Sequence, residues 1–234
     1  LKPSEHTPLT TELLKKVWDE STKEPQLFQA VYGAGEIGNE LVTSSHTDVI
    51  CFTGSTTVGR KIAKTCAPLF KPVILELGGK DPMIILDDAD LDRSVEAAVW
   101  GGLSNAGQTC ISIERIYVHK TVYNQVVTKM SAEIKGISSG GGNTFLGAIS
   151  VDGSLEKIKM QISDARENSE VVEGSADSGW FIPPTLVVNP PLEAKILQDE
   201  TFGPAITIQP FQSDEEAVKL ANMTGYGLSA SVFG

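Results

Sequence analysis

Short apolar segments alternate with amphipathic segments along nearly the whole of this sequence. The apolar segments have the length of strands, whereas several of the others repeat apolar residues at the 3.6-residue period of a helix. Extended segments or strands are predicted at residues 27–32, 49–53, 73–75, 83–86, 116–118, 183–188 and 205–208. Helices are predicted at residues 8–21, 36–44, 58–63, 90–100, 123–134, 155–168 and 213–223. This order predicts an α/β fold of parallel sheets with helices on both faces.

The composition and charge of the chain narrow the classes of partner. Of its 234 residues 41% are apolar, which is enough for a sizeable core. The formal net charge of −11 repels phosphate groups, so nucleic acid and membrane surfaces are disfavoured as partners. No apolar run approaches the roughly 20 residues that span a bilayer, and the first ten residues do not resemble a signal peptide. Three cysteines at no regular spacing predict free thiols in a reducing compartment, taken as the cytoplasm.

Two glycine-rich segments each follow a predicted strand and open a predicted helix. The first, GAGEIG at residues 33–38, fits a dinucleotide-binding pattern, but the next strand ends in FTG without the acidic residue that this pattern needs. We therefore interpret it as an ordinary strand-to-helix turn. The second, GSTTVG at residues 54–59, places small hydroxyl residues and free backbone N–H groups at a helix start, which favours a phosphate. Helix caps alone also explain Ser and Thr there.

The three cysteines differ in their surroundings. Cys51 lies in residues 49–53, which are most simply a buried parallel strand, and Cys66 ends a predicted helix. Both are predicted to be buried structural thiols. Cys110 instead lies in a polar, glycine-containing segment, which favours an accessible thiol with a lowered pKa. The local pattern leaves a nucleophile and a structural thiol equally open at Cys110.

Two acidic residues stand beside apolar or turn segments. Glu76 leaves an apolar strand, where burial would raise its pKa and suit a general base. A strand-ending glutamate that points to water is the alternative. Glu200 and Phe202 precede a Gly-Pro turn, and turn formation explains the Gly-Pro pair but neither of these two residues.

Six segments of the chain are KPSE at residues 2–5, FTGSTTVG at 52–59, LELGGK at 75–80, GQTC at 107–110, ETFGP at 200–204 and YGLSA at 226–230. Together they resemble the aldehyde dehydrogenase superfamily, in the order in which that family carries them. The resemblance covers the whole chain. It implies an NAD(P)-dependent enzyme that oxidises a small-molecule aldehyde to a carboxylic acid, with Cys110 as the nucleophile and Glu76 as the general base.

The resemblance also implies a set of cofactor contacts. Lys2 and Glu5 would bind the adenosine ribose, and the Glu5 carboxylate would favour NAD while leaving NADP possible. The segment with Gly54, Ser55 and Gly59 would lie by the pyrophosphate, with Ser55 as the phosphate contact. At the other end of the cofactor, the Leu77 backbone would contact the nicotinamide amide, Glu200 would hold the nicotinamide ribose, and Phe202 would pack beside the ring. No residue is assigned to a metal.

The same resemblance predicts the domains and some departures. Residues 1–77 would be the C-terminal part of an NAD(P)-binding Rossmann-like domain, and residues 78–234 the catalytic domain. The chain would be incomplete at both ends, lack the family's Asn donor for the oxyanion, and belong to a homo-oligomer when full-length. Three alternatives stay open: a fragment that does not turn over, a cofactor-binding or structural relative, and an enzyme that transfers the acyl group to CoA.

Overall fold

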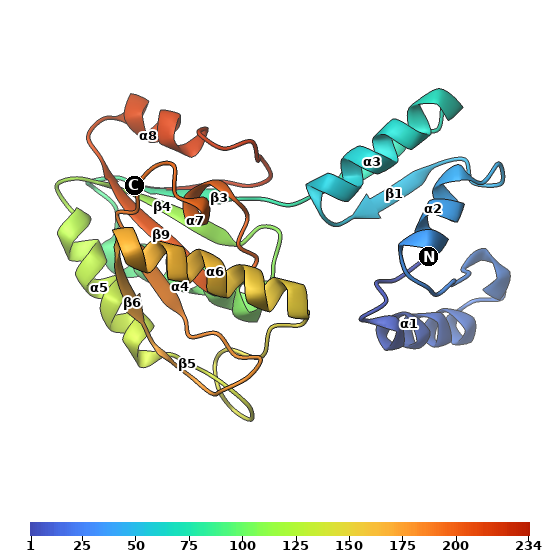
Figure 1. Ribbon diagram of the computed structural model, residues 1–234, viewed down its shortest axis with the longest axis horizontal. Coiled ribbons are helices and arrows are strands. Elements are labelled where there is room, and N and C mark those ends of the chain that lie inside the picture. Colours follow the sequence, from blue (N-terminus) through green and yellow to red (C-terminus); the bar gives the residue numbers. More distant parts are fainter. The chain divides into compact units, whose positions relative to one another are not determined.

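The computed structural model describes residues 1–234, which divide into two compact units, Leu1–Leu77 and Gly78–Gly234. Figure 1 shows the elements of both. None of the chain's helices combines the length and the apolar composition that a membrane-spanning helix requires. The first unit contains α1 (Pro8–Ser21), η1 (Pro25–Leu27), α2 (Gly35–Thr43), β1 (Ile50–Thr53), α3 (Thr56–Cys66), η2 (Ala67–Leu69) and β2 (Val73–Glu76). Strands β1 and β2 pair in parallel, so that Thr53 stands opposite Glu76.

The two strands of the first unit pack on α2 and α3 through one face only. Val42, Ile62 and Cys66 form a small buried cluster, and Ile50 and Phe52 of β1 pack against it. Side chains alternate between the two faces of a strand, so Cys51 points the other way and is exposed. The prediction of a fully buried strand with a buried Cys51 was therefore wrong, whereas the parallel pairing and the burial of Cys66 are confirmed.

The predicted strand at residues 27–32 is also wrong. Pro25 begins the short turn η1, which ends at Leu27, and the residues that follow form neither helix nor strand. The reason is the lack of a neighbouring strand. The Val31 N–H donates to the Leu1 carbonyl, and this segment makes no ladder. A largely apolar segment of this kind forms a strand only where the edge of another strand is available to pair with it.

The second unit is built on a six-stranded sheet in the order β10-β3-β4-β9-β8-β6. Its strands are β3 (Asp81–Ile85), β4 (Ile113–His119), β6 (Glu170–Glu173), β8 (Thr185–Val188), β9 (Ala205–Phe211) and β10 (Ser231–Phe233). All neighbours are parallel except β6 and β8, which are antiparallel. The short strands β5 (Ser138–Ser139) and β7 (Ser175–Ala176) pair separately from this sheet, in parallel.

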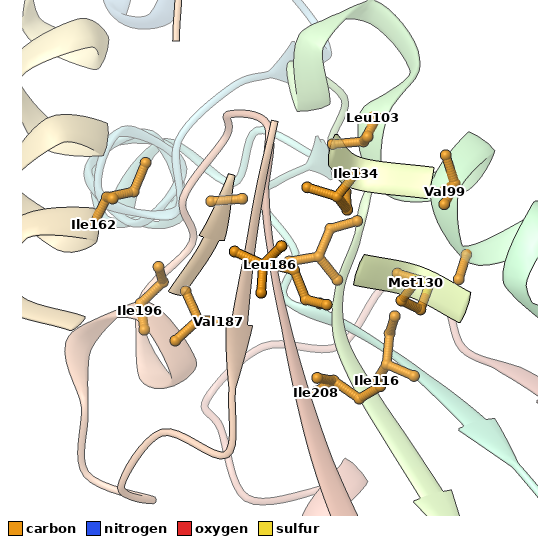
Figure 2. Packing of buried hydrophobic residues seen from close by; sticks show 14 of the residues in the cluster. Val99, Leu103, Ile116, Met130, Ile134, Ile162, Leu186, Val187, Ile196 and Ile208 are labelled. Atoms are coloured by element: carbon orange, nitrogen blue, oxygen red, sulfur yellow. The ribbon is translucent and has the colours of Figure 1, made fainter. Parts of the chain in front are cut away.

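Helices cover both faces of this sheet, as predicted. They are α4 (Leu91–Leu103), η3 (Ser104–Gly107), α5 (Tyr123–Gly136), α6 (Asp152–Asn168), α7 (Lys195–Gln198) and α8 (Asp214–Ala221). Figure 2 shows Leu186 of β8 between two groups of side chains, Ile162 and Ile196 on one side and Leu103 and Ile134 on the other. A separate buried cluster joins α8 to the sheet through Tyr117, Phe211 and Ala217. The sheet is therefore a buried layer that fixes the loops at its strand ends.

Candidate active site

A strained turn leads from α4 to Cys110. Asn105, Ala106 and Gly107 follow one another with φ of 55°, 56° and 69°, all in the left-handed region. Asn105 and Ala106 carry a Cβ, and such a residue costs roughly 1–2 kcal/mol in this conformation. Cys110 follows the turn and is half-buried. Strain of this kind persists only where surrounding contacts impose it, and it is concentrated at functional sites.

Gln108 supplies many of the contacts that impose the turn. Its amide nitrogen donates to the Asn105 carbonyl at 3.1 Å and to the Ala148 carbonyl at 3.2 Å. Its amide oxygen accepts the backbone N–H of Ser150 at 2.8 Å and the Ser150 hydroxyl at 2.7 Å. The Asn105 side chain closes the turn by donating to the Gln108 carbonyl at 3.1 Å. All hydrogen-bonding groups of the Gln108 amide thus bind either the turn before Cys110 or the segment at residues 148–150.

Three segments far apart in the sequence pack on one another through glycines. An added Cβ on Gly107 would lie 2.1 Å from the Gly203 carbonyl oxygen, and one on Gly79 would lie 2.4 Å from the Cys110 carbonyl oxygen. An added Cβ on Gly78 would lie 2.5 Å from a carboxylate oxygen of Glu200. Residues 78–80, 107–110 and 200–204 therefore meet in the second unit, where glycines allow the close approach.

Glu200 is held in this cluster by backbone and side-chain contacts. Its carboxylate accepts the Gly79 N–H at 3.1 Å, and its own N–H donates to the Tyr226 hydroxyl at 3.5 Å. Burial raises the pKa of Glu200, an effect opposed by the Gly79 hydrogen bond and by the charges of Lys157 and Lys80. Glu200 is a half-buried carboxylate that keeps acceptor capacity beyond the one hydrogen bond it makes.

The sequence interpretation missed a buried ion pair beneath this cluster. Lys80, 1% exposed, contacts the carboxylate of Glu114, 2% exposed, and also donates to the Thr201 hydroxyl at 2.9 Å. Burial lowers the pKa of Lys80, and the Glu114 carboxylate opposes that shift. The available signal was the Glu-Arg pair at residues 114–115 inside an otherwise apolar strand, because buried charges are kept only when paired. Arg115, for its part, donates to the Lys80 carbonyl at 2.7 Å.

Asp81 and Arg115 bind the C-terminal part of the chain, in the segment at residues 226–230 and in the end of the helix that precedes it. The Ser229 N–H donates to an Asp81 carboxylate oxygen at 3.3 Å, and burial raises the pKa of Asp81. Arg115 donates to the carbonyls of Leu220 at 3.0 Å and Ala221 at 2.8 Å. The segment YGLSA is therefore attached to β3 through Asp81, and the end of α8 that precedes it is attached to β4 through Arg115.

The remaining sequence candidates lie in the first unit. Ser55 caps α3, with its hydroxyl accepting the Val58 N–H at 3.3 Å. Gly59 allows Leu77 to pack closely, because an added Cβ would lie 2.5 Å from the Leu77 side chain. The Gly54 N–H donates to the Glu76 carbonyl at 3.0 Å, while the Glu76 side chain is exposed.

Two further candidates for cofactor contacts, Lys2 and Glu5, lie near the start of the chain. The Lys2 ammonium donates to the carbonyl of Gly33 at 2.8 Å, at the start of the GAGEIG segment, and Glu5 is exposed. Glycines 35 and 38 of that segment lie in α2, which begins at Gly35. The roles of Lys2 and Glu5 stay predictions, as does the interpretation of GAGEIG as an ordinary turn.

Comparison with known proteins decides the family. The whole chain, residues 1–234, matches the profile of the aldehyde dehydrogenase family. The chain belongs to this family. Betaine aldehyde dehydrogenase 1 of Oryza sativa subsp. japonica is 38% identical over 242 residues, which cover 99% of this chain and 48% of that protein. Lactaldehyde dehydrogenase of Escherichia coli (strain K12) is 34% identical over 245 residues, covering 100% of this chain and 50% of that protein.

Solved structures of aldehyde dehydrogenases have the same fold. Lactaldehyde dehydrogenase from Escherichia coli matches with a TM-score of 0.93 at 35% identity, over 99% of this chain and 50% of its own. NAD-dependent aldehyde dehydrogenase from Sinorhizobium meliloti matches with a TM-score of 0.95 at 32% identity, over 100% of this chain and 48% of its own. The chain thus spans about half the length of the curated relatives it matches, and it belongs to a family of enzymes.

Proposed function

We propose that this protein oxidises an aldehyde to a carboxylic acid with NAD, and that Cys110 is the nucleophile. The observation that carries this proposal is the convergence of three segments in the second unit. The strained turn before Cys110 packs on Gly203, the Cys110 carbonyl packs on Gly79, and the Glu200 carboxylate accepts the Gly79 N–H. A half-buried thiol in such a turn has the access that a nucleophile needs.

The residues present fit a nicotinamide cofactor. At the start of α3, the N–H groups of Thr56 and Thr57 have no acceptor within the helix. The N–H groups of Val58 and Gly59, in contrast, already donate to Ser55. Two free donors beside Gly54 suit a pyrophosphate. The half-buried Glu200 carboxylate suits ribose hydroxyls. The assigned contacts are Lys2, Glu5, Gly54, Ser55, Gly59, Leu77, Glu200 and Phe202.

The chemistry assigned to this chain begins at the thiol. Cys110, as a thiolate, attacks the aldehyde carbonyl to give a thiohemiacetal, and the Cys110 backbone N–H donates to the oxyanion. When bound, the cofactor supplies the acceptor for the hydride, and a thioester is left on Cys110. Glu76 takes a proton from the water that hydrolyses this thioester. In this proposal Leu1–Leu77 is the C-terminal part of the cofactor domain and Gly78–Gly234 is the catalytic domain.

The choice between NAD and NADP, the oligomeric state and the cellular location are also proposals. Among the relatives, one from Sinorhizobium meliloti is named NAD-dependent, and succinate-semialdehyde dehydrogenase of Escherichia coli is named for NADP. NAD is preferred here because of Glu5, and NADP is the alternative. A homo-oligomer and a cytoplasmic location stay predictions of the sequence. Transfer of the acyl group to CoA is disfavoured because Glu76 offers a base for water.

The proposal is tested by turnover and by product. The protein is incubated with NAD or NADP and a panel of small aldehydes, reduced cofactor is followed by absorbance, and the product is identified by mass spectrometry. Reduced cofactor together with a carboxylic acid supports the proposal. An acyl-CoA formed only when CoA is added replaces it by the CoA-dependent reaction. If the protein binds the cofactor but reduces it with no aldehyde of the panel, it is a binding module. This outcome is compatible with a chain that spans about half the length of its relatives.

Replacement of Glu76 by glutamine is expected to slow aldehyde oxidation by about a hundredfold or more, because the amide cannot accept the proton of the attacking water. The acyl group then accumulates on Cys110, which intact-protein mass spectrometry detects as added mass after one turnover. Glu40→Gln is the matched control, since Glu40 is also an exposed glutamate of the first unit. Unchanged turnover in Glu76→Gln would remove Glu76 from the mechanism.

Replacement of Glu5 by serine is expected to raise the ratio of kcat/KM for NADP to that for NAD by about tenfold. The carboxylate would repel a 2′-phosphate, and a repulsion of about 1.4 kcal/mol corresponds to that factor. Steady-state kinetics with both cofactors measure the ratio. Glu12→Ser, at another exposed acidic position of the first unit, is expected to leave it unchanged. An unchanged ratio in both variants contradicts the assignment of Glu5.

A further inference from the structure

Glu114 lies at the centre of a buried hydrogen-bond network. It belongs to β4 and is 2% exposed, four residues after Cys110 in the sequence. Its carboxylate accepts the Thr201 N–H at 2.8 Å and the Phe202 N–H at 2.9 Å, and it contacts the Lys80 ammonium. A buried carboxylate without partners is costly, so this full set of donors accounts for its presence in an apolar strand.

The turn that binds this carboxylate has an unusual backbone. Phe202 has φ of 55°, in the left-handed region, although it carries a large side chain. This conformation directs the successive N–H groups of Thr201 and Phe202 at the same carboxylate. Such a concave pair of N–H groups is a known form of anion site in proteins, and here the anion is a side chain of the same chain. The Glu114 charge therefore compensates the strain at Phe202.

Lys80 connects the same turn to the segment beside Cys110. Its ammonium contacts Glu114 and donates to the Thr201 hydroxyl at 2.9 Å. Its backbone follows Gly79, whose N–H donates to Glu200 and whose Cα lies against the Cys110 carbonyl. One buried ion pair thus links the residue before β3, strand β4 and the turn at residues 200–202, which contains Glu200 and Phe202.

We propose that Glu114 and Lys80 are positioning residues: their ion pair holds Glu200 and Phe202 in the arrangement that binds the nicotinamide end of the cofactor. Neither side chain needs to touch the cofactor or the aldehyde. The inference rests on the proposed function, since it assumes that Glu200 and Phe202 bind a nicotinamide cofactor. It adds a cause for their conformation, which local turn residues alone do not explain.

Glu114→Gln tests the proposal with two readouts. An amide in this place leaves two donors facing each other, either at Lys80 or at the turn, because it offers one acceptor oxygen in place of two. Amide hydrogen exchange of Thr201 and Phe202, measured without cofactor, is expected to accelerate by about tenfold or more. The dissociation constant and KM for NAD are expected to rise by about tenfold or more, as loss of charge-assisted hydrogen bonds implies. KM for the aldehyde and the alkylation rate of Cys110 are expected to stay within about twofold of the parent values, because the cofactor turn alone is changed.

A milder variant and a matched control accompany it. Thr201→Val removes the hydroxyl that accepts from Lys80 and leaves the ion pair, so the same changes are expected at about threefold. It carries the test if Glu114→Gln does not fold. Glu96→Gln, at an exposed glutamate of α4 without a side-chain partner, is expected to change neither readout.

The outcomes separate this inference from the proposed function. Faster exchange at residues 201–202 together with weaker NAD binding supports the positioning role. Unchanged exchange overturns it, and so does faster exchange with unchanged NAD affinity, which makes the ion pair a purely structural feature. A parent protein that binds neither NAD nor NADP overturns the proposed function first, and the positioning role for a cofactor with it.

Discussion

Replacing Cys110 by alanine is expected to lower aldehyde-dependent formation of reduced cofactor by about four orders of magnitude or more. Loss of a covalent nucleophile removes the whole route through the thiohemiacetal and thioester, and Cys110 is the only cysteine of the second unit. Aldehyde and NAD affinities are expected to change little, because the alanine methyl retains the Cβ and the backbone N–H. Stopped assays with saturating aldehyde measure the residual rate.

Cys51→Ala is the matched control for this result. Cys51 is the more accessible thiol, being exposed on β1, whereas Cys110 is half-buried. Turnover in Cys51→Ala is expected to stay within about twofold of the parent rate, as surface substitutions usually leave other sites undisturbed. Equal activity of the Cys110 variant and the parent would show that the measured reaction is not performed by this thiol. In the parent protein, an alkylating reagent is expected to modify Cys110 selectively. Aldehyde together with NAD is expected to protect Cys110 from this modification.

The sequence predicted the parallel sheet with helices on both faces because alternating periodicity is a local property. Helices such as α1 and α5 were placed within one or two residues of their observed bounds at most ends. The errors arose where structure depends on distant partners. Residues 27–32 have strand-like composition but no neighbouring strand, and Cys51 is exposed because β1 packs on its helices through one face only. Antiparallel β6 was missed because its four residues carry two glutamates.

The candidate site was predicted in a different way, through resemblance of whole segments. That resemblance named Cys110, Glu76 and Glu200, but it supplied no reason for the conformation of the backbone that carries them. Left-handed φ values at Ala106 and Phe202 are against the local preference of both residues, so no pattern of the sequence predicts them. They follow from contacts across the chain, such as those of Gln108 with Ser150.

The partners of the charged Glu114 side chain could not be predicted from the sequence either. A glutamate next to an arginine in a strand is compatible with an exposed pair on the edge of a sheet. Its actual partners, Lys80 and the backbone of Thr201 and Phe202, lie 34 to 88 positions away. Only the tertiary fold brings β3, β4 and the turn at residues 200–202 together, and a charge pattern read along one strand cannot specify which distant donors it will meet.

Gly107→Ala is expected to destabilise the second unit by about 3 kcal/mol or more and to abolish most activity. The added Cβ would lie 2.1 Å from the Gly203 carbonyl oxygen, 2.4 Å from its carbon and 3.0 Å from the Pro204 nitrogen. All three are backbone atoms, which cannot turn away as a flexible side chain would. The turn before Cys110 must then separate from the turn at residues 200–204, so overpacking adds to the cost of a left-handed alanine.

Gly142→Ala separates these two causes. Gly142 has φ of 78°, close to the 69° of Gly107, but an added Cβ meets nothing within 4 Å. Only the backbone cost remains, and we expect a loss of about 1 kcal/mol with normal turnover. Urea unfolding followed by circular dichroism measures both free energies of unfolding, and the dehydrogenase assay measures both rates. If the two variants lose the same stability, the close packing of Gly107 on Gly203 contributes nothing and left-handed strain alone explains the glycine. A large difference assigns that glycine to the contact between the turn before Cys110 and the turn at residues 200–204.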